Sequence, residues 1–413
     1  MIATSGRRRW LAVGLLFVAI LINYVDRGNL SVAAVPLMRD FGMSPAAMGT
    51  LLSAFFWSYS LLQIPAGYAV DRLGLKWVYA GAFLLWSLAS AAIGLAGSFR
   101  QILYLRLLLG VGETVAHPAS ISFIRRNFSE EQQGLPTAIY LSGMQFGPAI
   151  GAFLGSALLV KTGWRLLFVL TGLGACAWLV PWIALAPREP ALKIERPVAG
   201  TPPPVWRALF ATPLIPGILI GAFFYSYYWY YCLTWLPSYL VMSRGFSFMT
   251  MGAFTAIPLA GMAVVSMISS CMADRLIARV GRAMLIRKIF VITGYLLGSS
   301  ILVLPLMASP AAVMAALLSS LLGIGIASAN YWALTQAISP PAMIGRIIGC
   351  QNTIANLAGI CAPLITGFLV GRNRRFELSN TLAGVSLWIA AAAFLLLVRE
   401  RDAHTLHYWS GAA

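Results

Sequence analysis

Residues 44–73 read SPAAMGTLLSAFFWSYSLLQIPAGYAVDRL, a long apolar run that ends in an acidic and a basic residue. A related run lies 203 residues later, at 247–276, and reads SFMTMGAFTAIPLAGMAVVSMISSCMADRL. Both runs begin with serine, carry Met-Gly at the fifth and sixth positions and end in Asp-Arg-Leu. Similarity at a fixed offset indicates an internal repeat, so we expect two related halves.

The composition indicates a chain that crosses a membrane many times. Of its 413 residues, 60% are hydrophobic and only 10% are charged, and the mean hydropathy is +0.81. Because about 20 apolar residues span about 30 Å of hydrocarbon, the sequence predicts an all-α membrane protein with twelve transmembrane helices in two six-helix halves. The predicted spans are 10–38, 46–70, 77–97, 101–124, 135–160, 164–187, 213–242, 249–273, 288–307, 310–338, 347–371 and 378–398.

The repeat and the span positions predict three parts of the chain. Residues 1–187 form the N-terminal six-helix half, and residues 213–413 form the C-terminal half with a short cytoplasmic tail. The stretch between them, 188–212, is rich in proline and mixed charge, which is typical of a linker.

The net charge of +17 could suggest a nucleic-acid partner, but the basic residues flank the ends of the predicted spans. With the N-terminus in the cytoplasm, 19 of the 29 lysines and arginines lie inside, eight lie outside and two lie within spans. This distribution follows the positive-inside rule. We therefore expect a multi-pass protein of the cell's inner membrane with both termini cytoplasmic, no nucleic-acid partner and a monomeric state. The basic start, Arg7 to Arg9, resembles a secretory signal, but the following run is too long, so we interpret it as a retained first helix.

The stretch 67–76, GYAVDRLGLK, resembles the loop signature that the major facilitator superfamily carries between its second and third helices. The resemblance implies the major facilitator fold and a conformational latch, in which the acid caps a neighbouring helix and basic residues pair across the halves. Both expectations are physically reasonable, because an acid favours a helix N-terminus and glycine permits a tight turn. The predicted latch residues are Gly67, Asp71, Arg72, Gly74, Asp274 and Arg275.

Four further stretches resemble the anion:cation symporter branch, which includes hexonate, hexuronate, aromatic-acid and sialin-like carriers. They are NYVDRGNL at 23–30, SAFFWSYSLLQIP at 53–65, RLLLGVGE at 106–113 and LTWLP at 233–237. The resemblance implies that Arg27 contacts a substrate carboxylate and that Asp26 and Glu113 serve proton coupling. It also implies substrate contacts for Tyr59 and Asn352.

Four charged residues lie inside apolar spans: Asp26, Arg27, Arg106 and Glu113. Charges at bilayer depth cost roughly 2.5–3.5 kcal/mol each on insertion scales and usually mark an ion or substrate pathway. Asp26 and Arg27 point about 100° apart on a helix, so each needs a partner elsewhere. We predict crosswise pairing, Arg27 with Glu113 and Asp26 with Arg106; the alternative is a permanent salt-bridge network with a purely structural role.

On the fourth span, residues three, four and seven apart share one face, which places Arg106, Gly110, Glu113 and His117 in a stripe. Glycine in this stripe allows another helix to approach closely, and Pro118 is expected to kink the helix. His117 either tunes Glu113 and relays a proton or bonds a helix carbonyl.

Charge balance suggests the mechanism, because two acids and two bases sum to zero when all are ionised. Desolvation favours the neutral form of a buried carboxylic acid, and its protonation leaves a guanidinium free for an incoming carboxylate. The sequence therefore predicts a secondary active transporter, not an enzyme, that takes up an organic anion together with protons by alternating access. The proton is the coupling ion, and no other cofactor is expected.

Polar residues one helical turn from the implied contacts complete the predicted site. Gln63 lies one turn from Tyr59, and Asn356 lies one turn from Asn352. The predicted substrate-binding residues are Arg27, Tyr59, Gln63, Arg106, His117, Gln145, Asn352 and Asn356. Aromatic residues crowd the seventh span at 225–235, where they form core or an interfacial belt or stack on a sugar or benzoid ring.

Other patterns favour different functions. GMQFGPAIG at 143–151 resembles a signature of drug:proton antiporters, although small residues at this spacing also permit close helix packing. A non-transporting sensor with the same fold is a further alternative. GLGACA at 172–177 imitates a dinucleotide fingerprint but has no preceding strand, and the five cysteines lack metal-like spacing, so no metal site is predicted.

Overall fold

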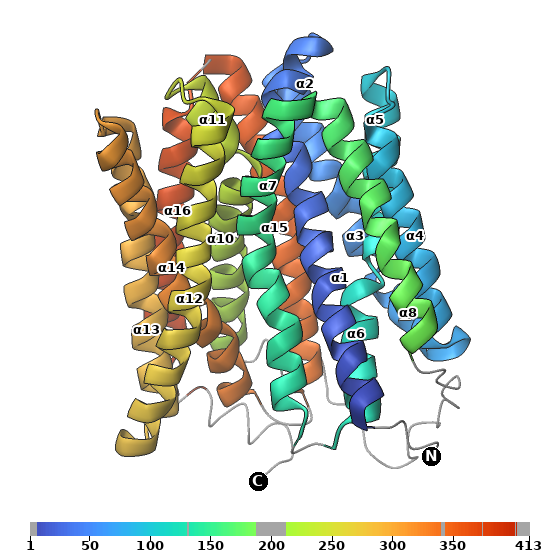
Figure 1. Ribbon diagram of the computed structural model, residues 1–413. Coiled ribbons are helices and arrows are strands. Elements are labelled where there is room, and N and C mark those ends of the chain that lie inside the picture. The colour runs from blue at the N-terminus through green and yellow to red at the C-terminus, as the bar shows by residue number, and fades with distance from the viewer. Residues whose placement is uncertain are drawn as a thin grey trace. The chain divides into compact units, whose positions relative to one another are not determined.

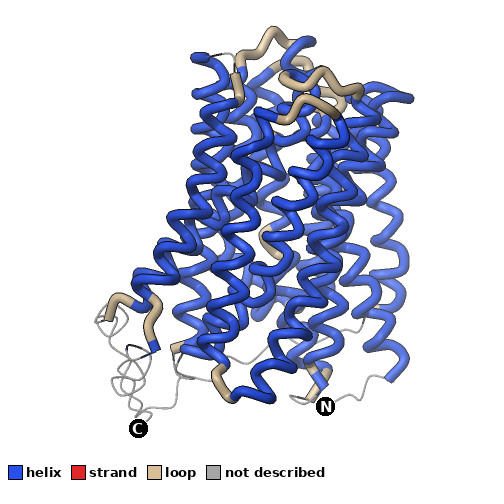
Figure 2. The backbone as a smooth tube through the Cα atoms, turned by 90° about the vertical axis from the view of Figure 1, so that its left-hand side faces the viewer, coloured by secondary structure: helices blue, strands red, loops and turns tan. Residues whose placement is uncertain are grey.

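The computed structural model describes residues 6–129, 132–186, 212–339, 343–373, 375–400 and 402, and within these ranges all regular structure is helical (Figures 1 and 2). Contacts between Cα atoms divide the chain into two compact units. Unit 1 comprises 1–195, 233–256 and 363–372, and unit 2 comprises 196–232, 257–362 and 373–413. Apart from Thr212, the predicted linker 188–212 lies outside the described residues.

Unit 1 is built mainly from the N-terminal helices. They are α1 (Gly6–Val32), α2 (Ala34–Asp40), α3 (Pro45–Leu73), α4 (Leu75–Ile93), α5 (Phe99–Glu113), α6 (Ala116–Asn127), α7 (Gly134–Ala175), the short 3₁₀ helix η2 (Cys176–Trp178) and α8 (Leu179–Leu185). The unit also includes α11 (Leu236–Met242), the first turns of α12 (Phe248–Val280) and the last turns of α15 (Ile344–Asn373).

Unit 2 contains the remaining helices and the greater parts of α12 and α15. The helices are α10 (Leu214–Thr234), whose last two residues group with unit 1, α13 (Ala283–Gly298), the 3₁₀ helix η3 (Ser299–Leu306), α14 (Pro310–Ile338) and α16 (Glu377–Leu397).

Each of the twelve predicted spans coincides with helical structure, which confirms the all-α membrane fold. Ten stretches among the described residues are long and apolar enough to cross a membrane. One of them, Gly134–Leu185, is 52 residues long and holds the predicted fifth and sixth spans. Gly163 separates these two spans, since its φ of 77° interrupts the helical backbone. The predicted seventh span corresponds to α10 followed by α11.

The repeat extends to local structure at the starts of α3 and α12. The Ser44 Oγ accepts a hydrogen bond from the Ala47 backbone N–H at 3.2 Å, and Pro45 occupies the first helical position. The Ser247 Oγ accepts the corresponding bond from the Thr250 N–H at 3.1 Å. A serine that caps the free N–H groups of a helix fixes where the helix begins, so both runs start in the same way.

Glycines bring α7 directly onto α1, which lies beside it in Figure 1. A Cβ atom at Gly143 would lie 2.5 Å from the Ile20 Cγ2, and one at Gly147 would lie 2.5 Å from the Tyr24 Cβ. Both distances are shorter than any real contact, so only glycine fits. The pattern that resembles a drug-export signature is therefore accounted for by close helix packing.

Within unit 1, the end of α15 packs equally closely on the start of α3. A Cβ at Gly49 would lie 2.5 Å from the Pro363 carbonyl oxygen, and one at Gly367 would lie 2.6 Å from the Pro45 carbonyl oxygen. Two opposed glycines thus allow backbone to touch backbone. This contact explains why residues 363–372 group with unit 1.

In each unit a lysine binds a carbonyl group just beyond the end of one helix. In unit 1, the Lys76 ammonium donates to the Ala186 carbonyl, just beyond α8, at 2.9 Å. In unit 2, the Lys288 ammonium donates to the Val398 carbonyl, just beyond α16, at 2.8 Å. Cations favour helix C-termini, where carbonyl groups lack intrahelical partners. The equivalent contacts are a second sign of the repeat.

Candidate functional site

Arg27 and Glu113 form the ion pair at the centre of the candidate site in unit 1. The Arg27 Nε lies 2.6 Å from the Glu113 Oε2, and the glutamate side chain is fully buried while the arginine keeps 15% exposure. A charge-assisted bond of this length is among the stronger interactions in proteins. The two terminal nitrogens of Arg27 have no hydrogen-bond partner among the described residues, so most of the guanidinium's donor capacity is unused.

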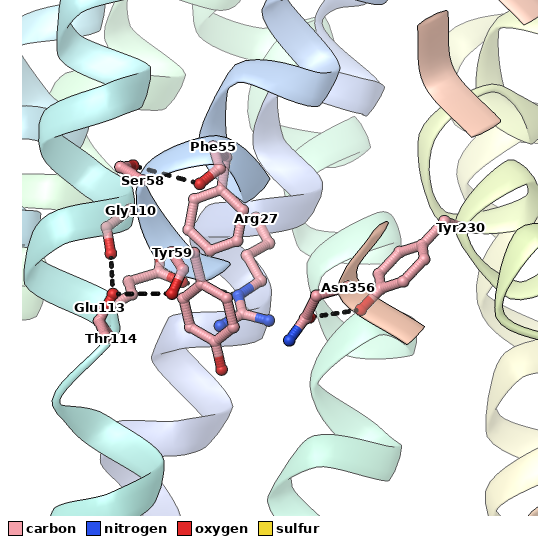
Figure 3. A network of polar contacts seen from close by, with 9 residues as sticks. All are labelled: Arg27, Phe55, Ser58, Tyr59, Gly110, Glu113, Thr114, Tyr230 and Asn356. Carbon is pink, nitrogen blue, oxygen red and sulfur yellow. Dashed lines mark hydrogen bonds and ion pairs between the residues drawn. The ribbon is translucent and has the colours of Figure 1, made fainter. Parts of the chain in front are cut away.

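Aromatic rings enclose the Arg27 guanidinium. Its central carbon lies 4.7 Å from the ring centres of Phe55 and Tyr59 and 4.9 Å from that of Tyr24. Phe55 and Tyr59 stack on each other with centres 5.2 Å apart, and Figure 3 shows Arg27 beside this pair. Cation–π contacts compensate a cation for lost water, so the rings hold Arg27 in place without using its N–H groups.

Asp26 is bound differently from the crosswise prediction. Its Oδ1 accepts hydrogen bonds from the Ser90 hydroxyl of α4 at 2.9 Å and from the Asn29 amide at 3.4 Å. Arg106 instead donates from Nε to the Leu51 carbonyl at 3.4 Å, and no ion pair joins it to Asp26 within the described part of the chain. The predicted contact of Arg27 with Glu113 is present, and that of Asp26 with Arg106 is wrong.

Several buried polar atoms in the same region form no hydrogen bond with the residues that the structure describes. They are the Oδ2 of Asp26, the Nη1 of Arg106, the Oε1 of Glu113 and both amide atoms of Asn23, a fully buried residue of α1. An unsatisfied buried polar group costs about 1–3 kcal/mol. Such a set of donors and acceptors is suited to ordered water.

Sequence reasoning missed the neutral residues of this region. Asn23, Asp26 and Asn29 are spaced by three residues on α1, and all three are buried. The Asn29 amide also donates to the Thr171 hydroxyl of α7 at 3.0 Å. Polar residues three apart within an apolar run were a signal of a shared face. The role of Ser90 had no sequence signal, since serine is common in membrane helices.

The fourth span breaks beside Glu113, so the predicted stripe is not continuous. Helix α5 ends at Glu113 and α6 begins at Ala116, which places His117 beyond the break. The Thr114 Oγ1 donates to the Gly110 carbonyl at 2.6 Å (Figure 3). Pro118 follows two residues into α6 and has no N–H to continue the helical ladder. Thr114 and Val115 nevertheless keep helical backbone angles, so only the regular hydrogen bonding is interrupted, at the place where the kink was expected.

Gly110 allows α5 to contact α3. A Cβ at this position would overlap the Ser58 hydroxyl and lie 2.5 Å from the Phe55 carbonyl oxygen. The Ser58 hydroxyl donates across the interface to the Leu107 carbonyl at 2.7 Å. This approach confirms the predicted reason for a glycine in the stripe and sets Phe55 near the ion pair.

The other predicted residues of unit 1 lie at varied positions. His117 Nδ1 is 3.3 Å from the hydroxyl of the buried Tyr140, so its observed partner is a tyrosine rather than Glu113 or a helix carbonyl. Tyr59, Gln63 and Gln145 are all half-buried. Of these three, only Tyr59 has a described contact with Arg27.

Unit 2, taken by itself, has neutral polar groups at its predicted site residues. The Asn356 Oδ1 accepts from the Tyr230 hydroxyl at 3.5 Å (Figure 3), and its Nδ2 is buried without a partner. Asn352, one turn earlier, is half-buried. The neighbouring Gln351 is fully buried, and its amide atoms form no hydrogen bond of normal geometry with the described residues. Sequence reasoning did not single out Gln351.

The aromatic residues of α10 form core contacts within unit 2. Tyr225 stacks on Tyr295 at 5.6 Å, the Tyr228 hydroxyl bonds Ser320 at 2.5 Å, and the Tyr231 hydroxyl bonds Asn380. These contacts favour the core interpretation of the aromatic cluster.

The predicted latch residues make contacts within their own units. Asp71 accepts a hydrogen bond from Arg126, at the end of α6, at 2.7 Å rather than capping α4. Gly74 has a φ of 86°, a left-handed conformation that glycine adopts without strain. Asp274 pairs with Arg287 at 2.6 Å. Of the remaining predicted residues, Gly67 is half-buried, and Arg72 and Arg275 are exposed.

These features define a polytopic helical membrane protein with a buried, charged site. The family model of the Major Facilitator Superfamily matches residues 16–363, and the chain belongs to this family. It is therefore a membrane transporter rather than an enzyme.

Three similar proteins illustrate the relationship. The chain is 29% identical over 421 residues to a D-galactonate transporter of Escherichia coli O6:H1, covering 96% of this chain and 97% of the relative. It is 31% identical over 398 residues to a hexuronate transporter of Bacillus subtilis, covering 93% of each. A crystal structure of a bacterial homologue of the human lysosomal transporter Spinster, inward-facing and unoccupied, matches with a TM-score of 0.74 at 19% identity, covering 99% of this chain and 98% of that one. The last similarity concerns the fold alone.

Proposed function

We propose that this chain is a proton-coupled symporter that takes up an organic anion, such as a sugar acid or an aromatic carboxylate, by alternating access. The observation that carries the proposal is the buried Arg27–Glu113 pair, in which the arginine uses only Nε and keeps both terminal nitrogens available. An anionic group can bind to these nitrogens in the two-pronged geometry that guanidinium favours.

Proton coupling follows from charge balance at the same pair. When Glu113 is ionised, it neutralises Arg27, and an added anion would leave the buried site negative. Protonation of Glu113 removes that neutralising charge, so Arg27 then attracts the anion more strongly. Loss of one partner from a buried pair costs about 3–5 kcal/mol, which an incoming carboxylate can offset. Proton and anion are then favoured to bind together and to cross in the same direction.

Asp26 offers a second place for a proton. Its Oδ2 is buried without a partner while its Oδ1 accepts from Ser90, so a proton on Oδ2 would relieve an uncompensated charge. The names of the relatives support the substrate class, since one is named for D-galactonate and one for hexuronate. Both cargoes are carboxylates with several hydroxyl groups. We place the protein in the inner membrane with both termini in the cytoplasm, as the charge distribution predicts.

The experiment uses purified protein in proteoliposomes. A thermal-shift screen of hexonates, hexuronates and aromatic carboxylates first identifies a bound anion, because a ligand stabilises the folded state by mass action. Uptake of this anion is then measured with an imposed pH gradient. We expect the anion to accumulate in the lumen against its concentration gradient and the lumen to become more acidic. This accumulation should be lost when the pH gradient is dissipated.

The decisive variant is Glu113→Gln, which mimics the protonated acid permanently. It should retain exchange of labelled for unlabelled anion but lose accumulation driven by the pH gradient. Glu377→Gln serves as the matched control, because this glutamate is 66% exposed at the start of α16. Normal uphill uptake by Glu113→Gln would refute the coupling role, and proton exit during cargo uptake would indicate antiport.

A further inference from the structure

A groove of about 430 Å³ lies along the first turns of α1 on the outer surface of unit 1. Its lining is one stripe of α1, with spacings of three and four residues, joined by the end of α8. The lining residues are Arg7, Trp10, Leu11, Gly14, Leu15, Val18 and Leu185. The groove is separate from the ion-pair site described above.

The chemistry of the groove changes sharply along its length. Arg7 stands at one end and is the only charged residue among the described residues of the lining, which are otherwise apolar apart from the indole N–H of Trp10. The eleven residue-to-residue steps from Arg7 to Val18 rise about 16 Å along a helix. That length matches one half of a hydrocarbon core that is about 30 Å thick. The stripe is therefore as long as the acyl region of a single leaflet.

The absence of a side chain at Gly14 creates the hollow. No atom of the described residues lies within 4 Å of the position that a Cβ would take there, so none of the described helices fills the space. The wall behind it is held in place, since the Trp178 indole N–H donates to the Leu15 carbonyl at 2.8 Å. This hydrogen bond ties the α1 wall of the groove to η2.

The nearby arginines are not equivalent. Arg9 donates to the Asn127 carbonyl at 3.3 Å and lies 4.9 Å from the centre of the Phe128 ring, so it serves the fold. Arg8 is exposed but does not line the groove. Arg7 is exposed at the mouth and has no ion-pair partner among the described residues.

We propose that this groove binds one anionic glycerophospholipid, with an acyl chain along Leu11, Gly14 and Val18 and the phosphate at Arg7. Lipid must cover this exposed apolar face in a membrane-spanning chain, and the cation at the mouth selects a negative headgroup. Trp10, 39% exposed, lies where indole rings favour the interface between headgroups and hydrocarbon. The bound lipid belongs to the leaflet at the N-terminal end of α1.

The test is a lipid titration of the purified full-length protein by native mass spectrometry, with phosphatidylglycerol and phosphatidylcholine of equal chain length. The wild type should retain one phosphatidylglycerol more strongly than phosphatidylcholine. Arg7→Gln should weaken this retention about fivefold, the effect of one basic residue near the membrane surface. Gly14→Leu should weaken retention of both lipids at this site, because the added side chain fills the groove without a clash.

Two variants serve as matched controls. Arg8→Gln removes the same charge one residue away, and Gly174→Leu adds the same side chain at an exposed glycine of α7 with no atom within 4 Å of its Cβ position. Both should bind as the wild type does. If Arg7→Gln and Arg8→Gln weakened phosphatidylglycerol retention equally, the retention would depend on the general surface charge and not on this groove. That result would overturn the proposal. Unchanged retention in Gly14→Leu, or equal retention of the two lipids by the wild type, would overturn it as well.

Discussion

The Arg27 side chain uses one N–H donor to bind Glu113 and leaves its other donors available for an anion. One nitrogen holds Glu113 at 2.6 Å, while the rings of Phe55 and Tyr59 support the guanidinium at 4.7 Å without accepting a conventional hydrogen bond. The terminal nitrogens therefore remain available for an anion. A lysine could not combine these tasks, because its single ammonium lacks the planar fork of a guanidinium.

Arg27→Lys is therefore expected to weaken anion binding although the charge is kept. The loss of one charge-assisted hydrogen bond, worth about 1.5–3 kcal/mol, corresponds to roughly tenfold or more in affinity. The measurement is the concentration dependence of the thermal shift with the anion found in the screen. Arg100→Lys, at an exposed arginine of α5, is the control. An unchanged affinity in Arg27→Lys would place the anion elsewhere.

Residue identities were easier to predict from the sequence than residue partners. The charges at Asp26, Arg27 and Glu113 stood out because they interrupt apolar runs. The partner of Asp26 could not be predicted in this way. It is Ser90 of α4, and this contact depends on how α1 is rotated against α4. Helix rotation follows from packing across the whole bundle, and spacing within one helix does not determine it.

At the scale of elements, glycines determine how closely the helices approach. Gly143 and Gly147 set α7 against α1, and Gly110 sets α5 against α3. The contact at Gly110 brings Phe55 of α3 close to α5, and the Phe55 ring lies 4.7 Å from the Arg27 guanidinium. The sequence predicted the spans because apolar length is a strong signal. The sequence did not predict where α5 ends and α6 begins. A proline interrupts the helical hydrogen bonds, but it does not specify at which residue the helix ends.

Gly147→Leu is expected to destabilise the protein. The new side chain would overlap Tyr24 and force α7 away from α1, and overpacking of this kind typically costs about 1–3 kcal/mol. The measurement is the thermal unfolding midpoint in detergent, which should fall. Gly174→Leu in the same helix has open space and should leave the midpoint unchanged. Equal midpoints for the two variants would contradict the packing argument.

At the scale of the whole molecule, the internal repeat links sequence and structure. Serine caps begin α3 and α12, and lysines close α8 and α16. The offset of 203 residues was visible in the sequence, whereas the lysine contacts were not. Lys76 and Lys288 are 212 residues apart, so a search at the fixed offset does not pair them. Equivalent contacts can thus persist while their positions drift along the helices.

The excess of basic residues on one side predicts that both termini are cytoplasmic. A C-terminal green fluorescent protein fusion expressed in a bacterium should fluoresce, and a C-terminal alkaline phosphatase fusion should be inactive. A phosphatase inserted at Gly42, in the turn between α2 and α3, should be active because this turn is predicted to lie outside. The reverse pattern would contradict the proposed orientation.

The single-nitrogen contact between Arg27 and Glu113 limits how a carrier of this kind can diversify. Under the proposed function, one pair serves both cargo recognition and energy conversion, so inherited change at either member impairs both. A lineage that adopts a new substrate must therefore alter neutral side chains around the pair, such as Tyr24 or Tyr59. The substrate can then change while the coupling to protons stays the same.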